Sequence, residues 1–290
     1  LASARFLAGL IYEVNGERDD ALISYRRSYN ILSDRGEPIP EALQISLLNL
    51  TQRQGFRQEY EVFSKRFGRQ AQLPATDEGE WFLIYFDGVI SNKTETRLSV
   101  YDGEVDTMVS VVMPHYAPVN YQPRGLTLVG GQRQRSAMIE NLEVRARQDL
   151  DAQRAKLLAA ATVRAVAKYK MVQEAQSKGD FGGILMNIAT VASEQADVRS
   201  WNMLPSSVQV ARITSKLNQP VSLAERAVTL PPQSEFAPAG KAIVLASSLI
   251  DQVYSWPSLP PQPTALPVAE QAGTQSPEEN PAQGESDAAP

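Results

Sequence analysis

The hydrophobic period of the chain changes three times, and this alternation restricts the folds that it can adopt. Apolar residues recur at helical spacing over residues 4–67 and at strand spacing over 81–114. Helical spacing returns from about Ser136, and alternation resumes in SVQVARI (207–213) and GKAIVLASS (240–248). Helices have a period of 3.6 and half-buried strands a period of 2, so these segments predict an α+β chain with a helical insertion in a β domain.

The first helical segment carries two helix-turn-helix patterns. Gly9 and Ala21 are small residues that let two helices approach, while Tyr12 and Tyr25 fill the space beside them. This is the spacing of a tetratricopeptide repeat. A second, degenerate pair ends near Phe67, and two pairs are fewer than the roughly three that normally stand alone. We therefore expect further repeats before this segment, or a following domain that caps it.

A polar stretch near Pro74 predicts a boundary between TPR-like helical repeats (1–70) and a β-rich domain (78–256). The strands after the insertion most simply rejoin the earlier sheet, which predicts a β-sandwich-like domain. Residues 257–290 are rich in Pro, Glu and Ala, and we expect a disordered tail because they have little to bury. The expected strands are 81–88, 94–101, 105–114, 124–131, 207–213, about 221–230 and 240–248.

Residues of about 136–200 predict a long helical hairpin that turns at GDFGG (179–183). Folding this hairpin about its glycine turn sets Arg164 opposite Asp197. The same folding sets Lys168 opposite Glu194. The two ion pairs would then form a ladder that fixes the register of the two helices. The functional alternative is an acid/base pair at the two carboxylates, as in a hydrolase. We favour the structural interpretation because acids with cations opposite them stay ionised.

The stretch that returns from the hairpin to the next strand is interpreted as a structural clamp. Asp197 lies near a helix C-terminus, where the helix dipole disfavours an anion, and Arg164 or Arg199 can compensate. Trp201 is expected to plug the gap between the hairpin and the sheet. Pro205 stops the helix and presets an extended entry into the strand.

Composition excludes several classes of function. The net charge of −5, without a dominant basic stripe, argues against nucleic-acid binding. Cysteine is absent, and the single histidine, His115, is expected in a Pro/Tyr-rich loop without a second metal ligand or a nucleophile. GGQRQR (130–135) lacks the spacing of a phosphate-binding loop. We therefore expect no enzyme activity, no metal and no other cofactor.

In this order of motifs the chain resembles a largely uncharacterised family of Gram-negative outer-membrane or periplasmic lipoproteins. The resemblance spans about residues 4 to 250 and implies export, a TPR-like segment and a β-rich domain with a helical insertion. It also implies a lipid anchor whose cysteine lies upstream of this segment. The resemblance is carried by FLAGLIYEVNGERDDALISYRRSY (6–29), RAVAKYK (164–170), ADVRSWNMLPSSVQVARI (196–213) and GKAIVLASS (240–248).

Two functions fit these observations. The first is a non-enzymatic adaptor or scaffold that binds envelope proteins through the TPR-like helices, at the periplasmic face of the outer membrane. The alternative is a peptidoglycan- or carbohydrate-binding module that uses Tyr116, Tyr121 and Trp256. Peptidoglycan is expected nearby in both cases, and membrane contact only through the upstream lipid anchor.

Overall fold

The computed structural model describes residues 1–119, 121–177, 196–199, 201 and 203–259. The described residues belong to one compact unit with a mixed α+β fold. None of the described helices is both long enough and apolar enough to cross a membrane. In chain order the elements are α1 (Ala2–Asn15), α2 (Arg18–Asp34), α3 (Glu41–Arg53), α4 (Arg57–Phe67), β1 (Glu78–Asp87), β2 (Lys93–Asp102), β3 (Thr107–Tyr116), β4 (Thr127–Val129), β5 (Arg133–Arg135), β6 (Ala137–Asn141), α5 (Leu142–Ser177), β7 (Ser207–Lys216), β8 (Val221–Leu223), the 3-10 helix η1 (Ala224–Arg226), β9 (Val228–Leu230), α7 (Gln233–Phe236), β10 (Lys241–Ser247) and β11 (Ile250–Trp256).

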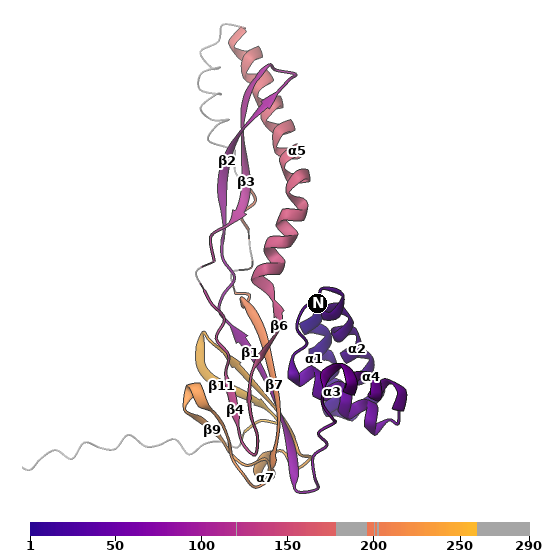
Figure 1. Ribbon diagram of the computed structural model, residues 1–290. Coiled ribbons are helices and arrows are strands. Elements are labelled where there is room, and N and C mark those ends of the chain that lie inside the picture. The colour runs from indigo at the N-terminus through magenta and orange to yellow at the C-terminus, as the bar shows by residue number, and fades with distance from the viewer. Residues whose placement is uncertain (120, 178–195, 200, 202, 260–290) are drawn as a thin grey trace, which may run out of the picture. The chain divides into compact units, whose positions relative to one another are not determined.

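A five-stranded sheet with the order β11-β10-β1-β7-β6 forms the centre of the fold (Figure 1). β1 runs parallel to β10, and all other neighbours are antiparallel. The side chains of β1 alternate between two apolar clusters, so that Phe82 and Ile84 face the helices while Trp81 and Leu83 face away from them. The prediction that the late strands rejoin the earlier sheet is confirmed for 207–213 and 240–248, because β7 and β10 flank β1. The strand expected at about 221–230 is instead divided into β8 and β9, which belong to a second sheet.

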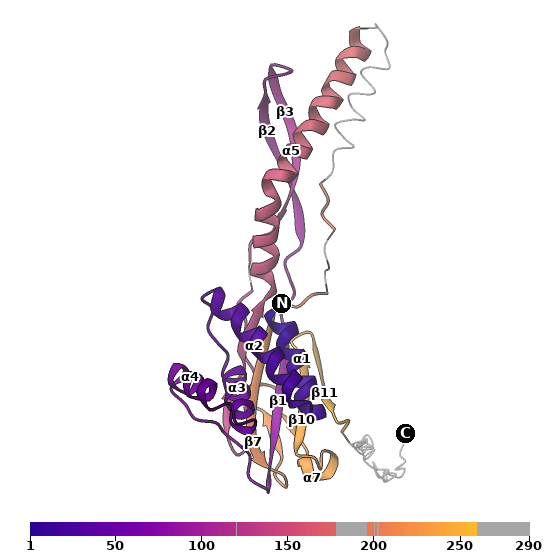
Figure 2. The ribbon, with the colours of Figure 1, turned by 90° about the vertical axis from the view of Figure 1, so that its right-hand side faces the viewer.

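Helices α1 to α4 form two antiparallel pairs that cover one face of this sheet (Figure 2). Gly9 and Ala21 are buried where α1 meets α2, as their spacing predicts. A Cβ atom on Gly9 would lie 2.7 Å from the ring of Tyr25, so only glycine permits this approach. The two pairs share one apolar cluster with the sheet, and the expected domain boundary near Pro74 is a connection inside that unit.

A second, four-stranded sheet with the order β5-β4-β8-β9 packs against the opposite face of the central sheet. Its buried side chains include Leu128, Val221 and Leu230, which join the cluster around Trp81. The central sheet is therefore covered on both faces, by helices on one and by short strands on the other. The residues of β1 and β7 are accordingly buried along almost their whole length.

The hairpin β2–β3 and the helix α5 pack together, and we call these three elements the arm. Val111 and Met113 on β3 contact the α5 residues Ala161 and Ala165 within one apolar cluster. α5 has 36 residues, which corresponds to a length of about 54 Å. The helix was expected from about residue 136, but residues 137–141 pair with β7 as β6. The second helix of the predicted hairpin lies outside the described residues.

Candidate functional site

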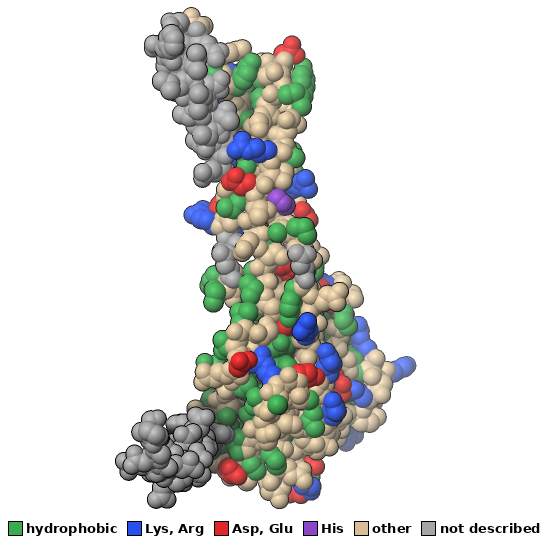
Figure 3. Space-filling model, turned by 90° about the vertical axis from the view of Figure 1, so that its left-hand side faces the viewer, with side chains coloured by type: hydrophobic (Ala, Val, Ile, Leu, Met, Phe, Trp, Pro, Cys, Tyr) green, Lys and Arg blue, Asp and Glu red, His purple; other side chains and the backbone are tan. Residues whose placement is uncertain are grey.

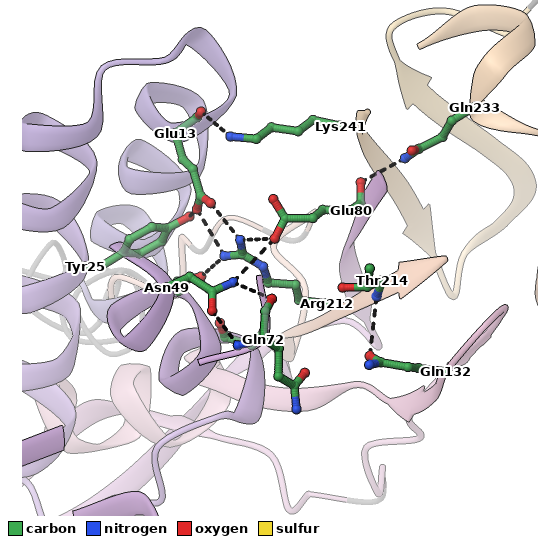
Figure 4. Close-up of polar contacts among 12 residues, drawn as sticks. Glu13, Tyr25, Asn49, Gln72, Glu80, Gln132, Arg212, Thr214, Gln233 and Lys241 are labelled. Atoms are coloured by element: carbon green, nitrogen blue, oxygen red, sulfur yellow. Dashed lines mark hydrogen bonds and ion pairs between the residues drawn. The ribbon is translucent and has the colours of Figure 1, made fainter. Parts of the chain in front are cut away.

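A buried ion network lies between the helices and the central sheet (Figure 4). Arg212 on β7 donates from Nη2 to Glu13 Oε1 at 2.7 Å and to Glu80 Oε1 at 2.5 Å. Its Nη1 donates to Ser46 Oγ at 2.6 Å, and the Tyr25 hydroxyl donates to Glu13 Oε2 at 2.9 Å. The two glutamates and the arginine are each no more than 2% exposed. The network therefore ties α1, α3, β1 and β7 together.

Within the network Glu80 and Arg212 hold each other in their ionised forms. Burial favours a raised pKa for Glu80, but the Arg212 guanidinium outweighs it and holds the pKa of Glu80 below its ordinary value. Burial, and then the Glu13 carboxylate, raise the pKa of Tyr25 well above the ordinary value. Burial lowers the pKa of Lys241, whose Nζ donates to the Glu13 carbonyl at 2.8 Å. Glu13, Glu80, Tyr25 and Arg212 are closed off from solvent, so their role is to hold the layers together.

Sequence reasoning missed this network, although a signal was present. Arg212 occupies the alternating position that Val208 and Val210 also occupy, and both valines are buried against the helices. A charged residue at an inward position of a buried strand requires a partner of opposite charge. The partner could not be identified, because Glu13 lies in a distant helix that gives no sign of facing the sheet.

Glu140 on β6 connects the helices to the first turn of α5. Its buried carboxylate accepts hydrogen bonds from the Ala2 backbone N–H at 2.7 Å and from Arg35 Nη1 at 3.2 Å. Arg145 on α5 donates to the same carboxylate from Nε at 3.2 Å and forms an ion pair with Glu37. One carboxylate therefore compensates the N-terminus of α1 and anchors α5.

Asp87 at the end of β1 binds the loop through which the chain returns from the arm. Its fully buried carboxylate accepts hydrogen bonds from the Tyr85 hydroxyl at 3.0 Å, from the Arg124 backbone N–H at 2.7 Å and from Gln209 Nε2 at 3.2 Å. The Tyr121 hydroxyl also donates to it. Burial and the hydrogen bond to Asp87 raise the pKa of Tyr121, so this phenol remains a donor. These donors satisfy the charge of Asp87 where burial would otherwise make it costly.

A pocket of about 180 Å³ lies inside the arm, between α5 and the hairpin. Arg147 closes one side, where it is bonded to Glu143 and to the carbonyls of Tyr116 and Ala117. His115, expected in a loop, instead lies in β3 and pairs with β2. The pocket is lined by Thr96, Leu98, Met113, Pro114, His115, Tyr116, Arg147, Leu150, Asp151, Arg154 and Leu157.

Of the two cations expected for Asp197, Arg199 pairs with it and, among the described residues, Arg164 does not. Asp197 pairs with Arg199 at 2.8 Å, and a hydrogen bond from Arg199 lowers the pKa of Asp197. Arg164 and Lys168 lie on α5, and the described residues contain no ion pair between Arg164 and Asp197. The predicted contact of Lys168 with Glu194 lies outside the described residues. Asp197 therefore obtains its cation two residues away rather than from across a hairpin.

The prediction that Trp201 plugs a gap is wrong, because its side chain is 76% exposed. The segment around it follows β2: Lys93 Nζ donates to the Arg199 carbonyl, and the Ala196 backbone N–H donates to Glu95 Oε1 at 2.9 Å. These contacts hold the segment along the arm instead of turning it toward the sheet. Pro205 lies just before β7, as predicted.

The three aromatic residues of the predicted carbohydrate site lie on separate elements. Tyr116 ends β3 and lines the arm pocket, Tyr121 is bonded to Asp87, and Trp256 ends the edge strand β11. Among the described residues, no aromatic contact joins any two of them. The geometry therefore offers three isolated rings rather than one sugar-stacking surface.

No protein-family model, curated protein or solved structure matches the chain. In the described part of the chain, no cluster of three or more His, Asp or Glu side chains is placed to hold a metal ion. Inferences about function therefore start from the contacts of this chain.

Proposed function

We propose that this protein is a non-enzymatic adaptor of the bacterial cell envelope that binds partner proteins through its TPR-like helices. The observation that carries this proposal is the double role of Glu140. It accepts hydrogen bonds from the helices, through Ala2 and Arg35, and from the arm, through Arg145. The helices and the arm are thereby held in a fixed relation, which suits an adaptor.

The available surface of the helices is the side turned away from the sheet. α1 and α3 contact the sheet, and α3 is buried along almost its whole length, so these two helices are already used inside the chain. α2 and α4 keep exposed apolar and basic side chains. We call this surface the outer helix face, defined by Ile23, Arg27, Phe56 and Val62. Exposed apolar residues beside arginine are typical of protein interfaces.

An enzymatic function is less well supported. The carboxylates Glu13, Glu80 and Asp87 are buried and hydrogen-bonded inside the fold, whereas Asp197 is held by Arg199. A general acid must reach a substrate in order to transfer a proton. The carbohydrate-binding alternative is weakened by the separation of its three aromatic residues.

The envelope location rests on the family resemblance, and the outer-membrane anchor is part of the same proposal. Both can be tested by expressing the full-length gene product in a Gram-negative host and fractionating the cells. Recovery in the outer-membrane fraction, with release after removal of the lipidated cysteine, is the expected result. Recovery in the cytosol of the same host would contradict the location without testing the helix surface.

Partner binding can be tested by placing a photo-reactive amino acid at Arg27 or Val62 on the outer helix face. The matched control is Thr229 on β9, which is also exposed but lies in the second sheet. We expect defined cross-linked species from the two helix positions, identified by mass spectrometry, and none from Thr229. Equal cross-linking from all three positions, or no cross-linking from any of them, would contradict the proposal.

A further inference from the structure

The pocket in the arm is apolar at its floor and charged at its mouth. Leu98 on β2, Met113 on β3 and Leu157 on α5 line the floor, and these side chains also take part in the apolar cluster that joins the hairpin to α5. Asp151 and Arg154 line the pocket as well, and both side chains are exposed to solvent. An apolar interior with a few polar groups is typical of sites for small molecules.

The helical spacing of α5 brings both charges to the side of the helix that faces the hairpin. The α5 residues of the pocket follow one another at intervals of about one helical turn, so they share one face. They are Arg147, Leu150, Asp151, Arg154 and Leu157. In the space-filling view, acidic, basic and apolar side chains lie beside one another along the arm (Figure 3).

Asp151 and Arg154 have no partner in the described part of the chain. Neither side chain forms a hydrogen bond or an ion pair there, with the other or with a further described residue. Arg147, the second arginine of the pocket, is by contrast bonded to Glu143 and to two backbone carbonyls. Within the described residues, the pocket therefore offers one available carboxylate and one available guanidinium, on neighbouring turns of one helix.

The size of the pocket and the spacing of these two charges restrict the ligand. The pocket has a volume of about 180 Å³, and an apolar cavity of about 150 Å³ holds one benzene molecule. The floor therefore accepts one small apolar group. Residues three apart on a helix have Cβ atoms about 5–6 Å apart, so Asp151 and Arg154 can contact an ammonium and a carboxylate group that are attached to the same carbon atom.

We infer that the arm pocket binds a free α-amino acid with an apolar side chain, such as leucine. Arg154 donates hydrogen bonds to the α-carboxylate, Asp151 accepts them from the α-ammonium group, and the apolar side chain lies against the floor. A simple carboxylic acid would place its anion beside an unopposed Asp151, and a simple amine would place its cation beside an unopposed Arg154. A zwitterion satisfies both charges. This site lies in the arm, and it does not depend on partner binding at the outer helix face.

His115 reports directly on occupancy of the pocket. It lines the pocket and is the single histidine of the chain, so the C–H signals of its ring are identified in a proton NMR spectrum. Both enantiomers of leucine are titrated into the wild-type chain at constant pH, with glycine as the probe that lacks an apolar side chain. We expect leucine to shift the His115 signals saturably and glycine to leave them unchanged. Equal shifts with glycine, or no saturable shift with either enantiomer, would overturn the inference.

Two analogues of leucine test the two charges of the ligand separately. 4-Methylpentanoate lacks the ammonium group, and 3-methylbutylamine lacks the carboxylate. Each loses one charge-assisted contact, so each should bind about tenfold more weakly than leucine. An analogue that binds as tightly as leucine would show that the pocket does not recognise a zwitterion, and would overturn the inference.

Two variants assign each charge of the ligand to its residue. R154Q should weaken the binding of leucine about tenfold without weakening that of 3-methylbutylamine, and D151N should do so without weakening that of 4-methylpentanoate. The matched controls R164Q and D149N remove exposed charges of α5 that lie outside the pocket, and they should leave leucine binding unchanged. If R154Q and D151N changed the dissociation constant of leucine no more than their controls, the assignment to this pocket would be overturned.

Discussion

Arg212 Nη2 lies 2.7 Å from Glu13 Oε1, and this ion pair joins the sheet to the first helix across a fully buried boundary. Because Arg212 also bonds Glu80, its removal leaves two buried carboxylates without a cation. We expect R212M to lower the free energy of unfolding by about 3–5 kcal/mol, measured by urea denaturation. R199M, which removes an exposed pair, should leave the transition unchanged.

The triple variant E13Q/E80Q/R212M provides a second comparison. It removes all three charges together, so it should recover much of the stability that R212M loses. If R212M were as stable as R199M, the network would not hold the helices on the sheet.

The raised pKa of Tyr25 predicts that the folded protein loses stability at alkaline pH. Burial and Glu13 raise its pKa in the folded protein, whereas an unfolded tyrosine titrates near pH 10. Below about pH 10 both states keep the proton and the stabilisation is complete; above it only the unfolded chain releases the proton, so stability falls as pH rises. Urea midpoints measured across this range should fall less steeply for Y25F than for the control Y254F. Identical slopes would show that Tyr25 titrates normally.

The close approach of α1 to α2 at Gly9 leaves no space for a side chain at this position. A methyl group there meets the ring of Tyr25, and that ring is fixed by burial and by its bond to Glu13. Overpacking outweighs the helix-forming advantage of alanine, so G9A should lose about 1–2 kcal/mol. The control is G103A in the β2–β3 turn, where no atom lies within 4 Å of the added group. Thermal melts that coincide for the two variants would contradict the prediction.

Val111 tests whether the arm can open separately from the sheets. V111D places a charge in the apolar contact between β3 and α5, whereas S110D places the same charge on the exposed side of β3. Hydrogen exchange should accelerate in α5 near Ala161 in V111D only, while β1 keeps its protection. Faster exchange throughout both sheets would show that arm and sheets unfold as one unit.

The sequence periods identified the elements that are buried on one or both faces. β1 and β10, which carry nearly uninterrupted apolar runs, and β7, which alternates, were each predicted within a few residues. β6 and β11 were missed for opposite reasons. β6 is short and runs directly into a helix, whereas β11 is half exposed and mixes polar with apolar residues.

The site was harder to predict because its parts are distant in sequence. Asp197 was correctly recognised as needing a cation, and of the two cations named for it the one two residues away, Arg199, forms the pair. Trp201 was assigned to the interior from its size alone. Periodicity gives the face on which a strand residue lies, but it does not say which distant helix covers that face, so the contact between Arg212 and Glu13 could not be anticipated.

The position of the arm in the sheet has a mechanical consequence. The chain leaves the sheet after Asp87 and after Asn141 and returns at Ser207, and these three residues are neighbours at one end of β1, β6 and β7. Ladder hydrogen bonds lie across the strands, so tension on the arm pulls these three strands lengthwise as a group and loads at once the row of bonds that joins β1 to its other neighbour, β10. A partner that applies force to the arm therefore loads the sheet in shear, the direction in which paired strands resist force best. It does not peel one strand away from an edge.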